Sequence, residues 1–233
     1  MWRPDINEWK WAKSIGGTYY DYATDVVGHP SGGAIVVGRI QNAVVQFGDT
    51  ELESQSTSNT LGFMAKIEDN GTWSWAEGIG DSGYNFARTV DIDSNGDVIV
   101  AGEFSNNLTL GNFTVTESNT ASVSLKDIFV AKYDETNSDW VWLAKGGGID
   151  GASVSDMDID SQDRIIVGGL FEGYAEFGNY NLSACNYSTS TTSDIMIVQL
   201  ETNGTWDSAN MMGRCGDDNN VKVSVDPVDN ILV

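Results

Sequence analysis

Residues 87–102 read ARTVDIDSNGDVIVAG, in which two apolar runs flank an Asn-Gly pair. An Asn-Gly pair between apolar runs is a strong hairpin signal, because both residues tolerate the backbone conformation of a tight turn. The second run recurs as AIVVG at 34–38 and as RIIVG at 164–168. This stretch is therefore one copy of a repeated pair of strands.

Three further markers recur in the same order along the chain. The first is a Trp-x-Trp pair, whose leading ring stands at Trp9, Trp73, Trp140 and Trp206, at spacings of 64 to 67 residues. The last copy has Ser208 in place of the second ring. The other two markers are a Phe-Gly or Leu-Gly pair, at 47–48, 110–111 and 177–178, and an apolar run, at 63–66, 127–132 and 194–199. Markers at one fixed period indicate stacked copies of a single supersecondary unit.

Each unit is expected to contain four strands, which in the middle copy lie at 86–93, 97–104, 127–134 and 139–145, with an insert at 105–126. Apolar runs such as Val98-Ile99-Val100 suit strands covered on both faces, as in blades that pack face to face. The sequence thus predicts an all-β fold, a partial β-propeller of four-stranded antiparallel blades. It is expected to form one domain over 1–233, with an orphan outer strand at 9–13, three complete blades at 21–77, 86–145 and 152–211, and an incomplete blade at 221–233.

The order of these markers resembles a known repeat. The pattern Ala-x-x-Val, an Asp-rich turn with Gly-Asp-Val-x-Val-x-Gly, then Phe-Gly, Asp-Ile-Phe-Val-Ala-Lys and Gly-Thr-Trp-x-Trp is similar to the bacterial and archaeal SBBP (seven-bladed beta-propeller) repeat. The best copy runs from Ala87 to Lys132; Leu61-Gly62 replaces the Asp-Ile pair in the first copy, and Gln199 replaces the lysine in the third. The resemblance implies an exported or surface-attached propeller within a larger protein, with no shared catalytic residues.

The chain is strongly acidic, with 34 acidic and 12 basic residues and a net charge of −22. Nucleic acids and anionic membrane surfaces would be repelled, so neither is an expected partner. No apolar run approaches the roughly 20 residues of a membrane helix. The acid excess suits divalent cations, a saline medium or simple solubility.

The most specific candidate metal site lies in the Asn-Gly turn. Asp91, Asp93, Asn95 and Asp97, with Gly96 at the bend, match the first half of a calcium loop that supplies oxygen ligands at alternate positions. The twelfth position, where such a loop has a chelating Glu, is Gly102. The alternative is a hairpin turn in which Asp and Asn bond their own backbone. Calcium is therefore a possible cofactor, and no other cofactor is expected.

No catalytic residue is predicted. His29 is the only histidine and stands beside Pro30 at an expected turn, which does not favour a Ser-His-Asp triad. The arginines, at 3, 39, 88, 164 and 214, are scattered singly rather than grouped. Carboxylates are too numerous for any one glycosidase-like pair to stand out.

The two cysteines, Cys185 and Cys215, do not recur in other copies. Cys185 lies in the insert of the third unit, and Cys215 lies in the connection to the next unit. Both connections leave the same end of a blade, so a disulfide is one expectation and two free thiols the other. Export would favour oxidation.

The leading functional hypothesis is a non-enzymatic binding scaffold of an extracellular or cell-surface protein. Its inserts, at 39–61, 105–126 and 171–193, would gather on one face and bind a protein or a polysaccharide. The alternative is a propeller glycosidase or lyase with its site at the central channel. An enzyme should bring non-repeated Arg, His, Tyr or Glu to one inner-strand mouth, and a scaffold should show only repeated residues there. The rest of its own propeller is a further expected partner, because bare blade faces associate.

Overall fold

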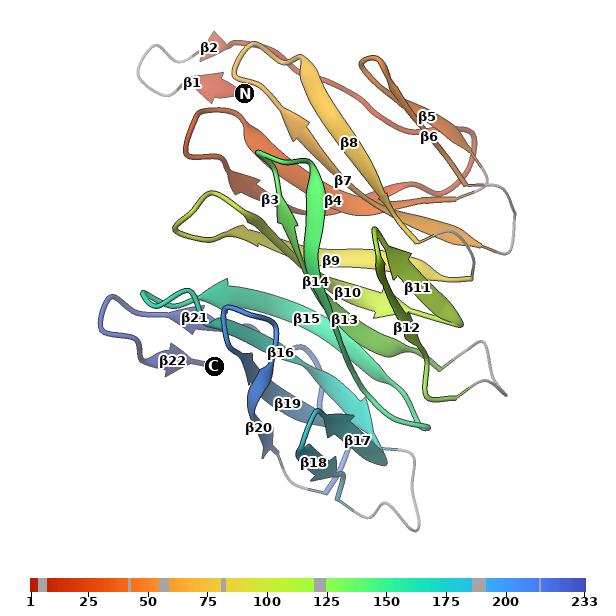
Figure 1. The fold of residues 1–233 in the computed structure, drawn as a ribbon, viewed down its shortest axis with the longest axis vertical. Coiled ribbons are helices and arrows are strands. Elements are labelled where there is room, and N and C mark those ends of the chain that lie inside the picture. Colours follow the sequence, from red (N-terminus) through yellow and green to blue (C-terminus); the bar gives the residue numbers. More distant parts are fainter. Residues whose placement is uncertain are drawn as a thin grey trace.

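The computed structural model describes residues 1–3, 8–41, 43–54, 59–80, 83–119, 125–185, 192–213 and 215–233. Every regular element in these ranges is a β-strand, and no helix capable of crossing a membrane occurs in them. The strands form three four-stranded antiparallel sheets and several two-stranded hairpins (Figure 1).

The three sheets are the predicted blades. Blade 1 consists of β3 (Tyr22–Gly28), β4 (Ala34–Gln41), β7 (Thr60–Ile67) and β8 (Trp73–Ile79). Blade 2 consists of β9 (Asn85–Ile92), β10 (Val98–Phe104), β13 (Asp127–Asp134) and β14 (Asp139–Gly146). Blade 3 consists of β15 (Ala152–Ile159), β16 (Ile165–Glu172), β19 (Ser193–Leu200) and β20 (Trp206–Met212). The strands of each blade lie side by side in chain order.

The blades pack on one another through their first strands. β9 lies against β3, β4 and β7 of blade 1, and β15 lies against β9, β10 and β13 of blade 2. One apolar cluster, which includes Ile35, Met64 and Val100, fills the space between blades 1 and 2. Another, which includes Ile99, Val130 and Val167, fills the space between blades 2 and 3. The predicted all-β partial propeller is therefore confirmed.

The two ends of the blades carry different chain connections. The turn end carries the tight turns between first and second strands, at 28–34, 92–98 and 159–165, and lies on the left of Figure 1. The insert end, on the right, carries the inserts and the connections between blades. All candidate sites lie at one of these two ends.

A glycine of the repeat lets the first and second strands approach closely. A Cβ on Gly38, Gly102 or Gly169 would lie 1.9–2.1 Å from a carbonyl oxygen of the first strand, beside a register shift in the pairing. In the third copy this residue is Gly169, so RIIVG at 164–168 is one residue out of register with its counterparts. Gly168 instead faces Val223.

Each insert contains a hairpin that runs back along the outer strand of its own blade. These hairpins are β5–β6 (Val44–Phe47, Thr50–Glu53), β11–β12 (Asn107–Leu110, Phe113–Thr116) and β17–β18 (Tyr174–Phe177, Tyr180–Ser183). The Phe-Gly marker forms the hairpin tip, where the Phe47 ring lies 5.2 Å from the Trp73 ring and Phe177 lies 5.1 Å from Trp206. The described parts of the inserts thus pack on the blades; residues 55–58, 120–124 and 186–191 lie outside the described ranges.

The second tryptophan of the Trp-x-Trp pair reaches the following blade. The Trp142 Nε1 donates to the Thr202 carbonyl at 3.1 Å, and its ring covers Gly204. Trp11 makes the same contact with blade 1, donating to the Asp69 carbonyl at 2.8 Å and covering Gly71. Trp11 therefore occupies the position that a preceding blade's outer strand would supply.

The predicted orphan strand at 9–13 differs from the structure. Trp9 belongs to β2 (Glu8–Trp9), which pairs with β1 (Trp2–Arg3), and residues 10–18 are in no strand. A strand needs a paired neighbour, and among the described residues only Met1 lies hydrogen-bonded to the backbone of this segment, at Lys10 and Trp11. At the other terminus, β21 (Ser224–Val225) and β22 (Ile231–Leu232) form a hairpin within the predicted incomplete blade at 221–233. Val221 and Val223 pack there on Ile166 of blade 3.

Cys185 and Cys215 are joined in a disulfide, with their Cα atoms 5.0 Å apart. Cys185 follows β18 in the blade 3 insert, and Cys215 lies between β20 and β21. Of the two expectations for these cysteines, the structure has the bridge, at the insert end.

Turn-end hydrogen bonds connect successive blades. The Ser94 backbone N and Oγ donate to the Asp163 carboxylate at 2.8 and 2.5 Å. Ser161 makes the same two bonds to Asp229, at 3.0 and 2.7 Å. Between blades 1 and 2 the serine position is Pro30 and the carboxylate position is Gly96. Neither residue could make these bonds, because Pro lacks an N–H and Gly lacks a side chain.

Candidate functional site

The predicted calcium loop is a turn closed by its own backbone and by a lysine. The Asp93 Oδ1 accepts from the backbone N of Asn95 at 2.9 Å and of Asp97 at 3.0 Å. The Lys132 Nζ lies 2.5 Å from Asp93 Oδ2 and 2.9 Å from Asp97 Oδ2. The ammonium group occupies the place between the two carboxylates that a cation would need. This arrangement is that of the alternative hairpin turn.

Asp91 does not join that turn. Its Oδ1 accepts from the Ile92 backbone N at 2.8 Å, and its side chain interacts with Asp158 of blade 3. The four residues predicted to bind calcium are therefore divided between two places. Over the described parts of the chain, no group of three or more His, Cys, Asp or Glu side chains is arranged to hold a metal ion.

Asp91→Asn is expected to stabilise the protein at neutral pH. Burial, and to a smaller extent the nearby carboxylates of Asp158 and Asp25, raise the pKa of the Asp91 carboxyl to about 6. Between about pH 4 and 6 the folded state keeps a proton that the unfolded chain releases, so stability falls as pH rises through that window. The amide carries no charge and can still accept from Ile92 N. Allowing for partial exposure, we expect a gain of about 1–2 kcal/mol at pH 7.5.

Urea unfolding at pH 4.5 and pH 7.5 measures this effect. The matched control is Asp49→Asn, which removes an exposed carboxylate from the tip of the β5–β6 hairpin. An Asp91→Asn protein no more stable than the parent at pH 7.5, or with an unchanged pH dependence, contradicts the assignment.

His29 occupies the turn position that Asp93 holds in blade 2. Its Nδ1 lies 2.7 Å from the Ser31 Oγ, and its Nε2 lies 2.8 Å from a Glu135 oxygen of blade 2. Lys66 also pairs with Glu135, and the Trp75 Nε1 donates to it at 3.3 Å. Ser31, His29 and Glu135 are thus connected in series, but Ser31 lines none of the described cavities. The contact ties blade 1 to blade 2.

The insert end brings together side chains that do not repeat. The residue after the repeat glycine is Arg39 in blade 1, Glu103 in blade 2 and Leu170 in blade 3. In each first strand, one residue places its carbonyl oxygen against the repeat glycine. This residue is Tyr22 in blade 1, Phe86 in blade 2 and Ser153 in blade 3. The fold accepts three different residues at each of these positions. The residue type is therefore not fixed by the fold, and it can be determined by ligand binding.

Two arginines and a lysine gather on aromatic rings at this end. The Arg39 guanidinium carbon lies 4.6 Å from the Phe86 ring centre and 5.3 Å from that of Tyr84, and its Nη1 donates to the Tyr84 oxygen at 2.6 Å. The Lys126 Nζ lies 4.3 Å from the Tyr84 ring centre. The Arg88 guanidinium carbon lies 3.9 Å from the Phe86 ring centre. Such cation–π contacts hold the charges in place on rigid strands.

Arg88 and Glu103 form a two-pronged ion pair. The Arg88 Nε and Nη2 donate to the two Glu103 oxygens at 2.9 and 3.0 Å. Glu103 is almost fully buried, and a buried carboxylate needs such charge-assisted bonds. The pair fixes the wall of the cavities beside it.

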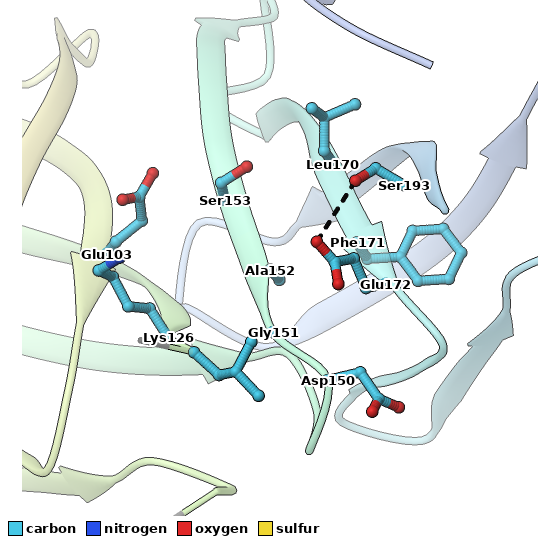
Figure 2. Close-up of a pocket in the computed structure, with 11 residues that line it drawn as sticks. Glu103, Lys126, Asp150, Gly151, Ala152, Ser153, Leu170, Phe171, Glu172 and Ser193 are labelled. Carbon is cyan, nitrogen blue, oxygen red and sulfur yellow. Dashed lines mark hydrogen bonds between the residues drawn. The ribbon is translucent and has the colours of Figure 1, made fainter. Parts of the chain in front are cut away.

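Two cavities of about 160 and 410 Å³ are both lined by Glu103, Ser153 and Leu170. The smaller lies at the insert end between blades 2 and 3, and the larger is lined by the first strands of all three blades, through Thr24, Arg88 and Ser155, and by the terminal segment. In the smaller one, Glu103 and Lys126 lie on one side of β15, and Glu172 and Ser193 lie on the other (Figure 2). Burial raises the pKa of the Glu172 carboxyl, which accepts from the Ser193 Oγ at 3.5 Å. Arg88 and Asn220 line the larger one.

Sequence reasoning missed this site. Arg39 and Arg88 stand 49 positions apart and were interpreted as scattered, but they meet at the ends of strands in neighbouring blades. The available signal was the residue after the repeat glycine, which changes from Arg39 to Glu103 to Leu170. An alignment of the three copies would have marked that position.

Comparison with known proteins adds no assignment. No protein-family model matches the chain, and no curated protein matches its sequence.

Proposed function

We propose that this chain is a polysaccharide-binding module. Its likeness to SBBP repeats implies that it belongs to an exported or cell-surface protein. Its ligand site is the pair of cavities that share Glu103, Ser153 and Leu170. The observation that carries the proposal is a pair of adjoining cavities lined by hydroxyl, amide and apolar groups, with the Arg39, Tyr84 and Phe86 side chains gathered nearby. The disulfide at the same end is of the kind that persists in oxidising, extracellular surroundings.

The lining of the cavities suits a sugar chain. Ser153, Ser193 and Asn220 offer hydroxyl and amide groups, and Leu170 offers apolar surface. A saccharide ring presents the same mixture of hydroxyl groups and apolar faces. A volume of about 410 Å³ falls within the range of small-molecule sites.

Two observations favour a second candidate, a propeller glycosidase or lyase. The first is that non-repeated Arg, Tyr and Glu side chains gather at the insert end, which is what an enzyme rather than a scaffold should show. The second concerns two carboxyl groups of the smaller cavity. Glu172, whose pKa is raised by burial, lines the same cavity as Glu103, whose oxygens are both held by Arg88. A carboxyl group with a raised pKa near an ion-paired carboxylate is the pattern of acid-assisted glycoside cleavage. A raised pKa in a cavity also marks a plain binding site, so turnover must be measured.

Leu170→Trp is the direct test. Leu170 lines both cavities, so an indole there would fill the site, and we expect at least a tenfold loss of binding to immobilised polysaccharides. Val141→Trp, at an exposed position on the outer strand β14, is the matched control and should bind normally. Release of reducing or unsaturated sugar ends by the parent protein would identify the enzyme. Equal binding by the parent and Leu170→Trp, or no binding by either, would reject the proposed site.

A further inference from the structure

The insert end holds two cations that lack a carboxylate partner. Within the described part of the three blades, five basic side chains form ion pairs: Lys66, Arg88, Lys132, Lys145 and Arg164. Arg39 and Lys126 form none with the described residues. In a chain with 34 acidic residues, a basic group seldom lacks a nearby carboxylate. Both side chains are half-buried, so their charged ends are available to an anionic ligand.

Both unpaired cations lie on one aromatic ring. The Arg39 Nη1 donates to the Tyr84 oxygen at 2.6 Å, and the Lys126 Nζ lies over the Tyr84 ring at 4.3 Å from its centre. The Arg39 Nε is buried and has no hydrogen-bond partner among the described residues. Because Tyr84 accepts from Arg39, its own hydroxyl proton is free for another acceptor. Three donor groups thus lie at or around one tyrosine, and one of them, Lys126, also lines the smaller cavity.

We infer that Arg39, Tyr84 and Lys126 form a subsite for a carboxylate carried by an acidic polysaccharide, such as a uronic acid residue. This inference rests on the proposed polysaccharide-binding function and names its ligand class. A carboxylate accepts from guanidinium, ammonium and phenol groups together, and these charge-assisted bonds are about twice as strong as neutral ones. The adjoining cavity would take the neighbouring sugar ring.

The surrounding charge explains how an acidic ligand could bind an acidic protein. The net charge of −22 repels a polyanion at long range, but salt screens exposed charges beyond about 10 Å. The smaller cavity is also lined by Glu103, Asp150 and Glu172, so a ligand carboxylate would bind only on the side where Lys126 and Arg39 lie. The site would then select a ligand whose carboxylate is placed to reach them, rather than any polyanion.

Calorimetric titration with an oligogalacturonide and with a neutral gluco-oligosaccharide of equal length tests this inference. The parent protein should prefer the oligogalacturonide, and its affinity should fall as salt concentration rises. Lys126→Gln and Arg39→Gln should each weaken that binding about tenfold or more and weaken binding of the neutral sugar by a clearly smaller factor. Lys13→Gln removes the same charge at an exposed N-terminal position and is the matched control. Because Arg39 contacts several rings, Lys126→Gln keeps the test valid if Arg39→Gln fails to fold.

Each remaining outcome is decisive. Preference for the neutral sugar overturns the acidic subsite while the polysaccharide-binding function stands. Binding of a poly-glutamate peptide but not of the oligogalacturonide overturns the ligand class in favour of an acidic protein. Binding of neither sugar rejects both the subsite and the proposed function. Equal losses in Lys13→Gln and Lys126→Gln would mean that net charge, not this site, controls binding.

Discussion

Gly102→Ala is expected to lower the free energy of unfolding by about 3 kcal/mol or more, the cost of forcing atoms into a closely packed strand pair. An added Cβ would lie 2.0 Å from the Phe86 carbonyl oxygen and 2.9 Å from the Phe129 ring. The first contact is with backbone, so no change of rotamer relieves it. The two strands would have to separate, and with them the packing between blades 1 and 2.

Urea unfolding monitored by tryptophan fluorescence measures the effect. Gly28→Ala is the matched control, because a Cβ there meets no atom within 4 Å and the residue also lies in a first strand. It should change stability by less than about 0.5 kcal/mol. Equal stability of the Gly102 and Gly28 variants would show that the strands are not as close as described.

Lys132→Gln is the second large expected loss. Lys132 and Asp93 are both largely buried, and removing the ammonium group leaves Asp93 without its charge partner. Breaking a buried ion pair in this way costs about 3–5 kcal/mol. Chemical denaturation should therefore shift to a clearly lower urea midpoint.

Blade 3 suggests a rescue. There Gln199 replaces the lysine, and Arg164, in the place of Asp97, donates from Nε to Asp160 Oδ2 at 2.6 Å. With its amide oxygen turned toward the guanidinium, Gln199 accepts from Arg164 at 3.3 Å. Adding Asp97→Arg to Lys132→Gln reproduces this arrangement and should recover at least half of the lost stability, whereas Asp97→Arg alone should destabilise. Additive losses in the double variant would contradict the equivalence of the two turns.

The fold could be predicted from the sequence because it depends on local sequence signals that repeat along the chain. The Asn-Gly turn at 95–96 and the apolar runs beside it placed the middle blade at 86–93, 97–104, 127–134 and 139–145, and the observed strands differ by one residue at most. The exception is instructive: Gly168 was aligned where Gly169 belongs, because two adjacent glycines leave the register open.

The candidate site could not be predicted from the sequence in this way. Its residues lie in different blades, and Arg39, Tyr84 and Lys126 carry no common spacing. The calcium hypothesis was based on the spacing of residues within one turn. It took no account of Lys132, which approaches the turn from another strand. Spacing along one strand predicts backbone structure well, but a site assembled between blades depends on how the sheets stack.

The serine–carboxylate bonds at the turn end bear on how such a chain can lengthen. Blade 3 carries both halves of the contact, Asp163 toward blade 2 and Ser161 toward the terminal hairpin. A gene segment encoding this blade, duplicated in tandem, would produce a new junction already supplied with both partners. The junction between blades 1 and 2 lacks them and relies on His29 and Glu135, which occur once. Growth by duplication is therefore favoured on the C-terminal side of blade 2, where successive units are interchangeable.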